Sequence, residues 1–221
     1  MSGVSTYWRW FLGIAISSMN AFTASYANAQ IIPDTTLPNN SNVRVQGRVF
    51  NITGGTQAGS NLFHSFQQFS VPTGGATFFN NAVNIQNIIS RVTGGSVSNI
   101  DGLLRANGTA NLFLINPNGV IFGPNASLYV GGSLAVSTAN AIQFGEQGFF
   151  SATQPNSPPL LTVNPSAFFF NKITPGNIVV QGQTGRVSQV AAGGSLVLLG
   201  GNILIDGNLD AQSERVELGG K

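Results

Sequence analysis

The chain has no cysteine, a single histidine, and only nine Lys/Arg and seven Asp/Glu among 221 residues. Without cysteine it has no disulfide framework, thiolate metal site, iron–sulfur cluster or cysteine nucleophile. One histidine excludes a site built from several imidazole ligands, so we expect no metal site and no cofactor. Charged residues make up 7% of the chain, against roughly 25% in an ordinary soluble domain. Few side chains are therefore left for catalysis.

The positive charge of the chain is also small. The formal net charge is +2, although the sequence pI is about 9.4. Nucleic-acid binding needs Lys and Arg gathered on one face, and here they are scattered, so we expect no nucleic-acid partner. Disorder caused by excess charge is excluded too, because 42% of the residues are apolar.

The first 29 residues have the pattern of a secretory signal peptide. A short apolar run covers residues 10–16, and Ala27 and Ala29 fit the small-x-small cleavage rule. Spanning a bilayer takes about 20 apolar residues, and polar residues interrupt this run from Ser17 onward. We expect cleavage before Gln30 and no integral membrane span.

Short motifs recur along the chain. Thr-Gly-Gly occurs at 53–55, 73–75 and 93–95, with a spacing of 20 residues. Gly-Gly-Ser-Leu at 131–134 recurs at 193–196, each time before an alternating apolar run. Self-similarity at such a period is a signature of a solenoid.

The C-terminal stretch shows how one repeat is built. Four short runs with alternate apolar residues begin at Leu196, Ile203, Leu209 and Val216. Runs this short predict strands with one inward face, and the 28 Gly and 24 Asn of the chain supply corners. Three strands every 20 or so residues describe one coil of a parallel β-helix. The 192 residues after the signal peptide allow at most about nine coils. Asn side chains stacked in successive coils would form hydrogen-bonded ladders. A sandwich or barrel of β-hairpins is the alternative.

Two stretches break the repeat and set the expected organisation. Residues 30–42 and a strand over Val43–Ile52 should cap the first coil. Residues 146–176 hold five of the ten Pro and the run Phe168–Phe170. We expect this stretch to be an extrahelical loop or hairpin packed on the flank by its Phe side chains, with a ligand-facing aromatic patch as the alternative.

The expected organisation is a signal peptide at 1–29, a capped β-helix domain at 30–145, the excursion at 146–176, and further coils at 177–221. The last coil has no polar cap, which suggests a truncated exoprotein or a short product whose downstream passenger is missing.

The middle of the chain carries several motifs in a distinctive order. They are Asn87-Ile-Ile-Ser-Arg-Val-Thr-Gly-Gly95, Ile100-Asp-Gly102, Ala110-Asn-Leu-Phe-Leu-Ile-Asn-Pro-Asn-Gly-Val-Ile-Phe-Gly123, Gly131-Gly-Ser-Leu134 and Ser137-Thr-Ala139. This order resembles the haemagglutination activity domain at the N-terminus of filamentous haemagglutinin-like proteins, the exoproteins of bacterial two-partner secretion. The resemblance covers about residues 40–145.

The resemblance implies a fold and a role. The fold is a right-handed parallel β-helix with an N-terminal cap and extrahelical elements. The role is export through the periplasm and across the outer membrane to the cell surface. The implied partner is an outer-membrane translocator barrel with periplasmic polypeptide-transport-associated domains, and exported members often act as adhesins on a host or cell-surface receptor. The family's Asn-Pro-x-Gly-Ile motif is matched at Asn116, Pro117, Gly119 and, conservatively, Val120. With Asn111 and Asn118 these residues form the candidate secretion motif.

The residues of this motif also predict a local structure. Pro117 presets φ near about −65°, and Asn118 or Gly119 can take positive φ, which gives a corner between two strands. The corner serves folding alone, or it also contacts the translocator. The sequence leaves both interpretations open.

An enzyme is the alternative from another class, because parallel β-helices also include polysaccharide lyases and hydrolases; a glycan-binding module is a further one. A hydrolase needs two carboxylates flanking a groove. The acids cluster only over 206–217, near predicted corners, and Asp101 fits a turn. Alternation with Phe63 predicts a surface or corner position for His64. We therefore expect no catalytic residue.

Overall fold

The computed structural model describes residues 30–155, 161–172, 174–181, 189–190, 193–206 and 215–220. Within these ranges the chain forms 21 strands and no helix, so none of the described segments is a helix of the length and apolarity needed to cross a membrane. Ala27, Ala29 and the run expected at Leu209 lie outside these ranges. Cleavage before Gln30 therefore stays a prediction.

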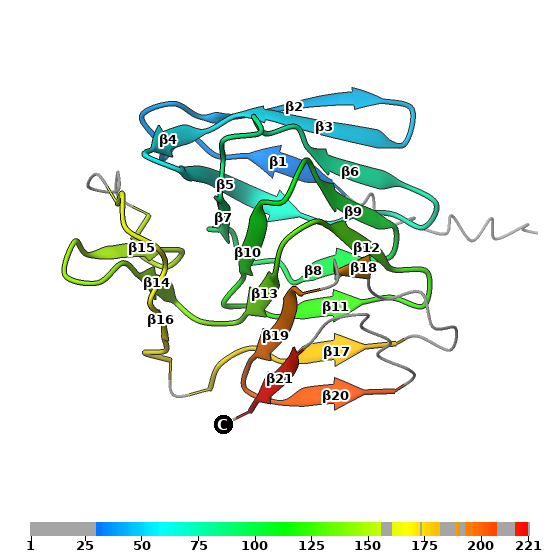
Figure 1. Cartoon of the computed structure of the whole chain (residues 1–221). Coiled ribbons are helices and arrows are strands. Elements are labelled where there is room, and N and C mark those ends of the chain that lie inside the picture. The colour runs from blue at the N-terminus through cyan, green and yellow to red at the C-terminus, as the bar shows by residue number, and fades with distance from the viewer. Residues whose placement is uncertain are drawn as a thin grey trace, which may run out of the picture.

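Three mainly parallel sheets, here named A, B and C, wind around one apolar core (Figure 1). A complete coil passes through sheets A, C and B in turn, as in β7 (Asn87–Val92), β8 (Ser98–Ile100) and β9 (Leu103–Ala106), and again in β10 (Asn111–Ile115), β11 (Val120–Phe122) and β12 (Ser127–Val130). The other solenoid strands are β5 (Asn61–Phe69), β13 (Leu134–Ser137), β19 (Ser195–Leu199) and β21 (Arg215–Gly219) in sheet A, β6 (Ala76–Phe79) and β18 (Gln189–Val190) in sheet B, and β17 (Ile178–Val180) and β20 (Ile203–Ile205) in sheet C. The predicted β-helix is confirmed, with about six coils in the described residues.

Coil length falls along the chain, which corrects the 20-residue repeat expected throughout. Asn87 lies beside Asn61, 26 residues away, and Asn111 beside Asn87, 24 residues away. Val216 pairs with Leu196, 20 residues away. The first coils are therefore longer than predicted, and the Thr-Gly-Gly triplets do not stack on one another. The two Gly-Gly-Ser-Leu segments do stack, because β13 and β19 pair in register.

Four strands at the N-terminus cover the first coil. They are β1 (Ile31–Pro33), β2 (Ser41–Gln46), β3 (Val49–Gly54) and β4 (Thr56–Ala58). β1 and β4 lie antiparallel to β5, and β2 lies antiparallel to β3, which itself joins the parallel stack through β6. The cap is confirmed, but Val43–Ile52 is not one strand. The chain reverses at Gly47, which takes a φ of 61°.

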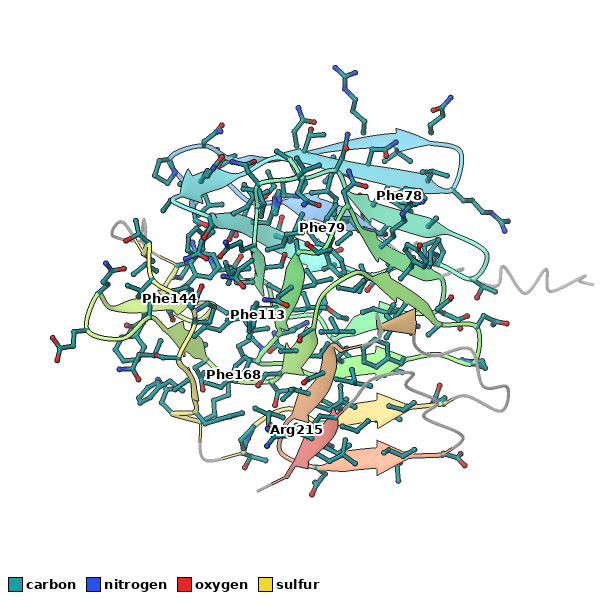
Figure 2. The ribbon with its side chains drawn as sticks, viewed as in Figure 1. Phe78, Phe79, Phe113, Phe144, Phe168 and Arg215 are labelled. Carbon is teal, nitrogen blue, oxygen red and sulfur yellow. The ribbon has the colours of Figure 1, made fainter. Side chains whose placement is uncertain are left out.

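An extrahelical sheet leaves the solenoid between β13 and β17 and projects from its flank (Figure 1). Sheet D consists of β14 (Ala141–Gln143) flanked by the antiparallel strands β15 (Phe149–Ser151) and β16 (Ala167–Phe169). It therefore includes a strand that precedes the predicted start at residue 146. Phe113 of β10 and Phe168 of β16, both labelled in Figure 2, have ring centroids 6.5 Å apart.

The excursion creates a second apolar cluster on the outer face of sheet A. Phe144 and Phe150 from the excursion pack against Phe63, with ring centroids 5.5 and 4.9 Å away. Ile89 and Ile115 of sheet A belong to the same cluster. Sheet A is therefore covered on both faces over β5, β7 and β10. This explains why β7 is buried along its whole length and does not alternate.

Candidate functional site

The candidate secretion motif forms the corner between β10 and β11. The Gly119 N–H donates to the Asn116 carbonyl oxygen over 3.0 Å, which closes a turn around Pro117 and Asn118. Gly119 takes a φ of 123°, and a Cβ there would lie 3.0 Å from the carbonyl oxygen of Asn177. The predicted corner is confirmed, and glycine is required at its last position.

The two asparagines of this corner bind the corner of the preceding coil. The buried side chain of Asn116 donates through Nδ2 to the Ser96 carbonyl oxygen and to Ser98 Oγ, both over 2.9 Å. Its Oδ1 accepts the Asn118 backbone N–H over 3.0 Å. Asn118 Nδ2 donates to the Gly94 carbonyl oxygen over 2.7 Å. The amide groups of the motif are thus engaged in joining two coils.

The segment that leads from the excursion back to β17 covers the other side of the corner. Lys172 Nζ donates to the Pro117 carbonyl oxygen over 3.3 Å. A Cβ at Gly176 would lie 2.6 Å from the backbone carbon of Asn118, so only glycine permits this approach. The Val120 N–H donates to the Asn177 carbonyl oxygen over 3.0 Å. The corner is therefore enclosed by neighbouring segments in the folded chain.

A cavity of about 280 Å³ lies beside the corner. Its walls come from the corner, from one Thr-Gly-Gly triplet and from the excursion: Val92, Thr93, Gly94, Gly95, Pro117, Asn118, Ala152, Thr153, Pro155 and Lys172. None of these ten residues carries a carboxylate, a thiol or an imidazole. The cavity therefore offers hydrogen-bonding groups and one positive charge, but no pair of groups for acid–base chemistry.

Asn111, also part of the candidate motif, is one rung of an asparagine ladder. Asn87 Nδ2 donates to Asn61 Oδ1 over 2.8 Å, and Asn111 Nδ2 donates to Asn87 Oδ1 over 2.9 Å. The predicted ladder is confirmed. The excursion extends it, because Asn61 Nδ2 donates to the Leu161 carbonyl oxygen and Asn87 Nδ2 to Asn164 Oδ1, over 2.8 and 3.0 Å.

Sequence reasoning missed a buried ionic network behind the corner. Arg91 donates through Nε to Ser65 Oγ and through Nη2 to Thr36 Oγ1, both over 2.8 Å. Ser65 and Thr93 donate in turn to Asp34 over 2.7 and 2.6 Å. Burial alone would raise the pKa of Asp34, but hydrogen bonds from Thr36, Thr93 and Ser65 lower it. Burial lowers the pKa of Arg91 to about 10, although the negative charge of Asp34 raises it. Both groups therefore stay ionised at neutral pH.

Arg91 also joins the solenoid to the excursion. Its Nη1 donates to the Ser151 carbonyl oxygen over 2.8 Å, and its guanidinium carbon lies 4.2 Å from the ring centroid of Phe150. The only sequence signal for this role was a charged residue inside an apolar run, at the fifth position of Asn87–Val92.

Among the residues that the structure describes, the remaining candidates for chemistry do not converge on a site, and Asp210 and Glu214 of the acidic cluster lie outside those residues. His64, expected at the surface, is 1% exposed and hydrogen-bonded through Nδ1 to Ser41 Oγ over 3.0 Å, which corrects that prediction. Asp101 lies at a corner as expected, and its carboxylate accepts hydrogen bonds from Thr73 and Asn125. The described residues contain no cluster of His, Asp and Glu that could hold a metal ion.

Comparison with known proteins identifies the class. Residues 29–221 match the family described as the TPS secretion domain. The match covers most of the chain, so the chain belongs to this family, and the resemblance to filamentous haemagglutinin-like exoproteins is confirmed. Proteins of this class are two-partner-secretion exoproteins, which are secreted across the outer membrane and work with a cognate outer-membrane translocator.

A curated relative is the heme/hemopexin-binding protein of Haemophilus influenzae, which is 27% identical over 208 residues. The match covers 90% of this chain and 20% of the relative. The chain therefore spans about a fifth of the length of that protein. The family and the relative together favour a non-enzymatic secreted protein.

Proposed function

We propose that this chain directs export through a cognate outer-membrane translocator and nucleates a β-helical surface or adhesive protein. The translocator is a barrel with periplasmic polypeptide-transport-associated domains, and the adhesive protein binds a host or cell-surface receptor. In this proposal the candidate motif, Asn111 and Asn116–Val120, is recognised before the chain folds.

The burial of Asn116 is the observation that supports recognition of the unfolded chain. Its side chain is 0% exposed, its Nδ2 donates to Ser96 and Ser98 of the preceding coil, and its Oδ1 accepts the Asn118 N–H within the corner. A partner that contacts this amide must therefore meet it before β10 and β11 reach their places. The lack of cysteine supports the same order of events, since no disulfide closes the chain in the oxidising periplasm.

The solenoid architecture supports folding after export. From β7 onward, the described strands of sheet A pair with the strands of the adjacent coils, so a newly emerged coil can add to those already formed. The capped first coil provides the surface on which this growth begins.

The proposed test separates secretion from folding at one corner. Asn118→Ala removes the 2.7 Å hydrogen bond to Gly94 but leaves the Asn116 amide in place. With the cognate translocator coexpressed, we expect secretion of this variant to fall at least tenfold, while its free energy of unfolding after refolding falls by only about 1 kcal/mol. Asn125→Ala is the matched control, because Asn125 also follows a proline at a solenoid corner but is exposed. We expect its secretion to be unchanged. If secretion of both variants simply follows their stability, the motif serves folding alone.

The observations on this chain give no support for heme or hemopexin binding, the function for which the relative is named. The chain covers only a fifth of that protein, and histidine is a common heme ligand. The single histidine here is buried against Ser41 inside the first coil.

A further inference from the structure

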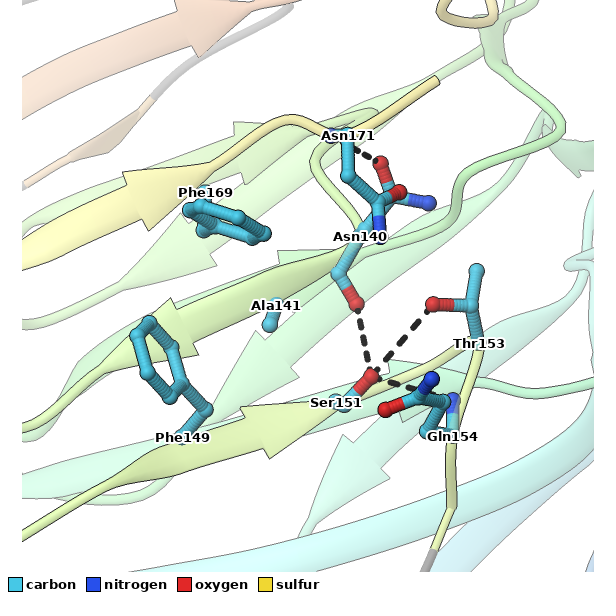
Figure 3. A pocket seen from close by; sticks show the side chains of 8 residues that line it. All are labelled: Asn140, Ala141, Phe149, Ser151, Thr153, Gln154, Phe169 and Asn171. Atoms are coloured by element: carbon cyan, nitrogen blue, oxygen red, sulfur yellow. Dashed lines mark hydrogen bonds between the residues drawn. The ribbon is translucent and has the colours of Figure 1, made fainter.

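Sheet D has an inner and an outer face with different chemistry. Ile142 pairs with Phe150 and Phe168 on the inner face, which packs against sheet A. On the outer face, Ala141 lies between Ser151 and Phe169 in the neighbouring strands. Because the central strand presents only a methyl group there, the outer face is hollowed into a cavity of about 250 Å³. Figure 3 shows Ala141 in the middle of this hollow.

Two exposed aromatic rings form one wall of the hollow. Phe149 and Phe169 are 45% and 46% exposed, and their ring centroids lie 5.4 Å apart at 56°. The neighbouring Phe150, by contrast, is completely buried. Packing on the solenoid thus accounts for the inner rings of the excursion but not for this outer pair. Exposed apolar groups gathered beside polar ones are typical of binding surfaces.

Asn140 lies at the opposite wall. Asn140 is 2% exposed, and its Oδ1 accepts the backbone N–H groups of Asn171 and Lys172 over 2.9 and 3.3 Å. These two donors fix which end of the amide is oxygen. Its Nδ2 is buried and has no hydrogen-bond partner among the described residues. Because this donor is buried, a ligand in the hollow does not reach it, and the amide of Asn140 instead positions the segment at Asn171 and Lys172.

The other polar groups around the hollow are neutral. They are the hydroxyls of Ser151 and Thr153 and the amides of Gln154 and Asn171. Since none of the eight lining residues is charged, an ionic ligand would lose its hydration without gaining a counter-charge. The volume lies below the range of about 300–1,000 Å³ typical of sites for drug-sized ligands, so the hollow suits a single small ring.

We propose that the outer face of sheet D binds a neutral saccharide. One pyranose ring would pack its C–H face on Phe149 and Phe169 and direct its hydroxyl or acetamido oxygens to the neutral side chains of Ser151, Thr153, Gln154 and Asn171. The proposal gives the adhesive role proposed above a ligand class and rests on that role for its biological use. Binding itself does not depend on export.

The test is saturation-transfer NMR of the full chain, refolded and purified, with three neutral probes. These are N-acetyllactosamine, maltose and methyl α-mannoside, each at up to 20 mM, with glucuronate as the charged comparison. We expect transfer from at least one neutral probe, with a dissociation constant of about 1 mM, as suits a small and open site. Absence of transfer from all three, or stronger transfer from glucuronate, overturns the proposal.

Three variants locate the site. Ala141→Leu fills the hollow and Phe169→Ala removes part of its wall, and each should weaken binding at least tenfold. Tyr129→Ala is the control, because Tyr129 is an aromatic residue 50% exposed on β12, outside sheet D. Its affinity should be unchanged. Equal affinity in Phe169→Ala and Tyr129→Ala overturns the proposal, even where Ala141→Leu does not fold.

Measuring the secretion of the same variants with the translocator distinguishes the proposed export function from the proposed saccharide binding. Ala141→Leu and Phe169→Ala should be exported as the wild type is, because both leave the candidate motif intact. Saccharide binding by a chain that no translocator exports would contradict the proposed export function alone. Export without saccharide binding would contradict this inference alone.

Discussion

His64 shows how a single buried side chain couples this fold to pH. Its ring lies inside the first coil, where it is hydrogen-bonded to Ser41 and contacts the rings of Phe66 and Phe79. Burial lowers its pKa to about 3 from the ordinary value of 6.5. The folded chain therefore keeps this imidazole neutral at pH values where the unfolded chain protonates it.

We predict that the free energy of unfolding falls by about 2 kcal/mol between pH 7.5 and pH 5.0. The folded pKa of His64 lies below the unfolded one, so its contribution is fully present above pH 6.5 and is lost as the pH falls toward 3. The pKa values of Asp34 and Asp101 are lowered from 3.8, so their contributions are lost only below this interval. Urea unfolding at the two pH values gives the measurement.

The control for this prediction is His64→Asn, which removes the titrating group. The variant should start from a lower stability, because it disturbs a packed interior, but its stability should hardly change between the two pH values. A pH dependence equal to that of the wild type would show that another group is responsible.

The wrong placement of His64 has a definite physical cause. Alternation correctly put His64 and Phe63 on opposite faces of β5, but it assumed that one face meets solvent. Phe63 packs instead against Phe144 and Phe150 of the excursion, so both faces of the strand are buried. A contact between segments about 80 residues apart leaves no trace in the local pattern that sequence reasoning uses.

At the scale of elements, the asparagine ladder joins the coils to one another and to the excursion. Sequence reasoning could predict the ladder, since like residues at the same position of successive coils must stack. It could not predict that Asn164 and the Leu161 carbonyl oxygen extend the ladder sideways. Those contacts depend on how the excursion folds back, and not on the repeat.

We predict that Asn87→Ala lowers the free energy of unfolding by about 3 kcal/mol. The variant loses two donated hydrogen bonds, to Asn61 and Asn164, and one accepted from Asn111. It also leaves buried polar groups without partners, and each such group lowers the free energy of unfolding by about 1–3 kcal/mol. Chemical denaturation of the variant and the wild type measures the difference.

Asn99→Ala is the matched control within a strand. Asn99 lies on β8 with its side chain exposed, and exposed substitutions usually change stability by no more than about 0.5 kcal/mol. If the two variants prove equally stable, the ladder contributes nothing beyond the stacking of the strands.

At the scale of the whole molecule, the low charge of the chain and its architecture have one explanation. Stacked coils satisfy backbone groups through the adjacent strands and bury their apolar residues in a continuous core. Charged groups contribute at particular places, in the buried network of Arg91 and Asp34 and in the exposed pair Arg215–Glu217 on β21. The repeated short runs were therefore enough to predict the fold class. Coil length and the strands of sheet D were not predictable, because corners accept insertions without changing the strand pattern.

The solenoid should unfold from one end, because its coils differ in how well they are covered. β7 and β10 lie between paired strands of sheet A and below the excursion, and Ile88 and Leu112 are completely buried. β21 pairs with β19, and its Val216 and Leu218 are 44% and 50% exposed.

We predict that backbone amides of β7 and β10 exchange with deuterium at least about 100-fold more slowly than those of β21, because opening of the last coil breaks fewer contacts. Amides of β19 should exchange at rates between those of β7 and β21. Hydrogen–deuterium exchange followed by mass spectrometry on the 221-residue chain tests this order. Equal protection of β7 and β21 would instead show that all coils open together, and that the solenoid is one cooperative unit in spite of its nearest-neighbour contacts.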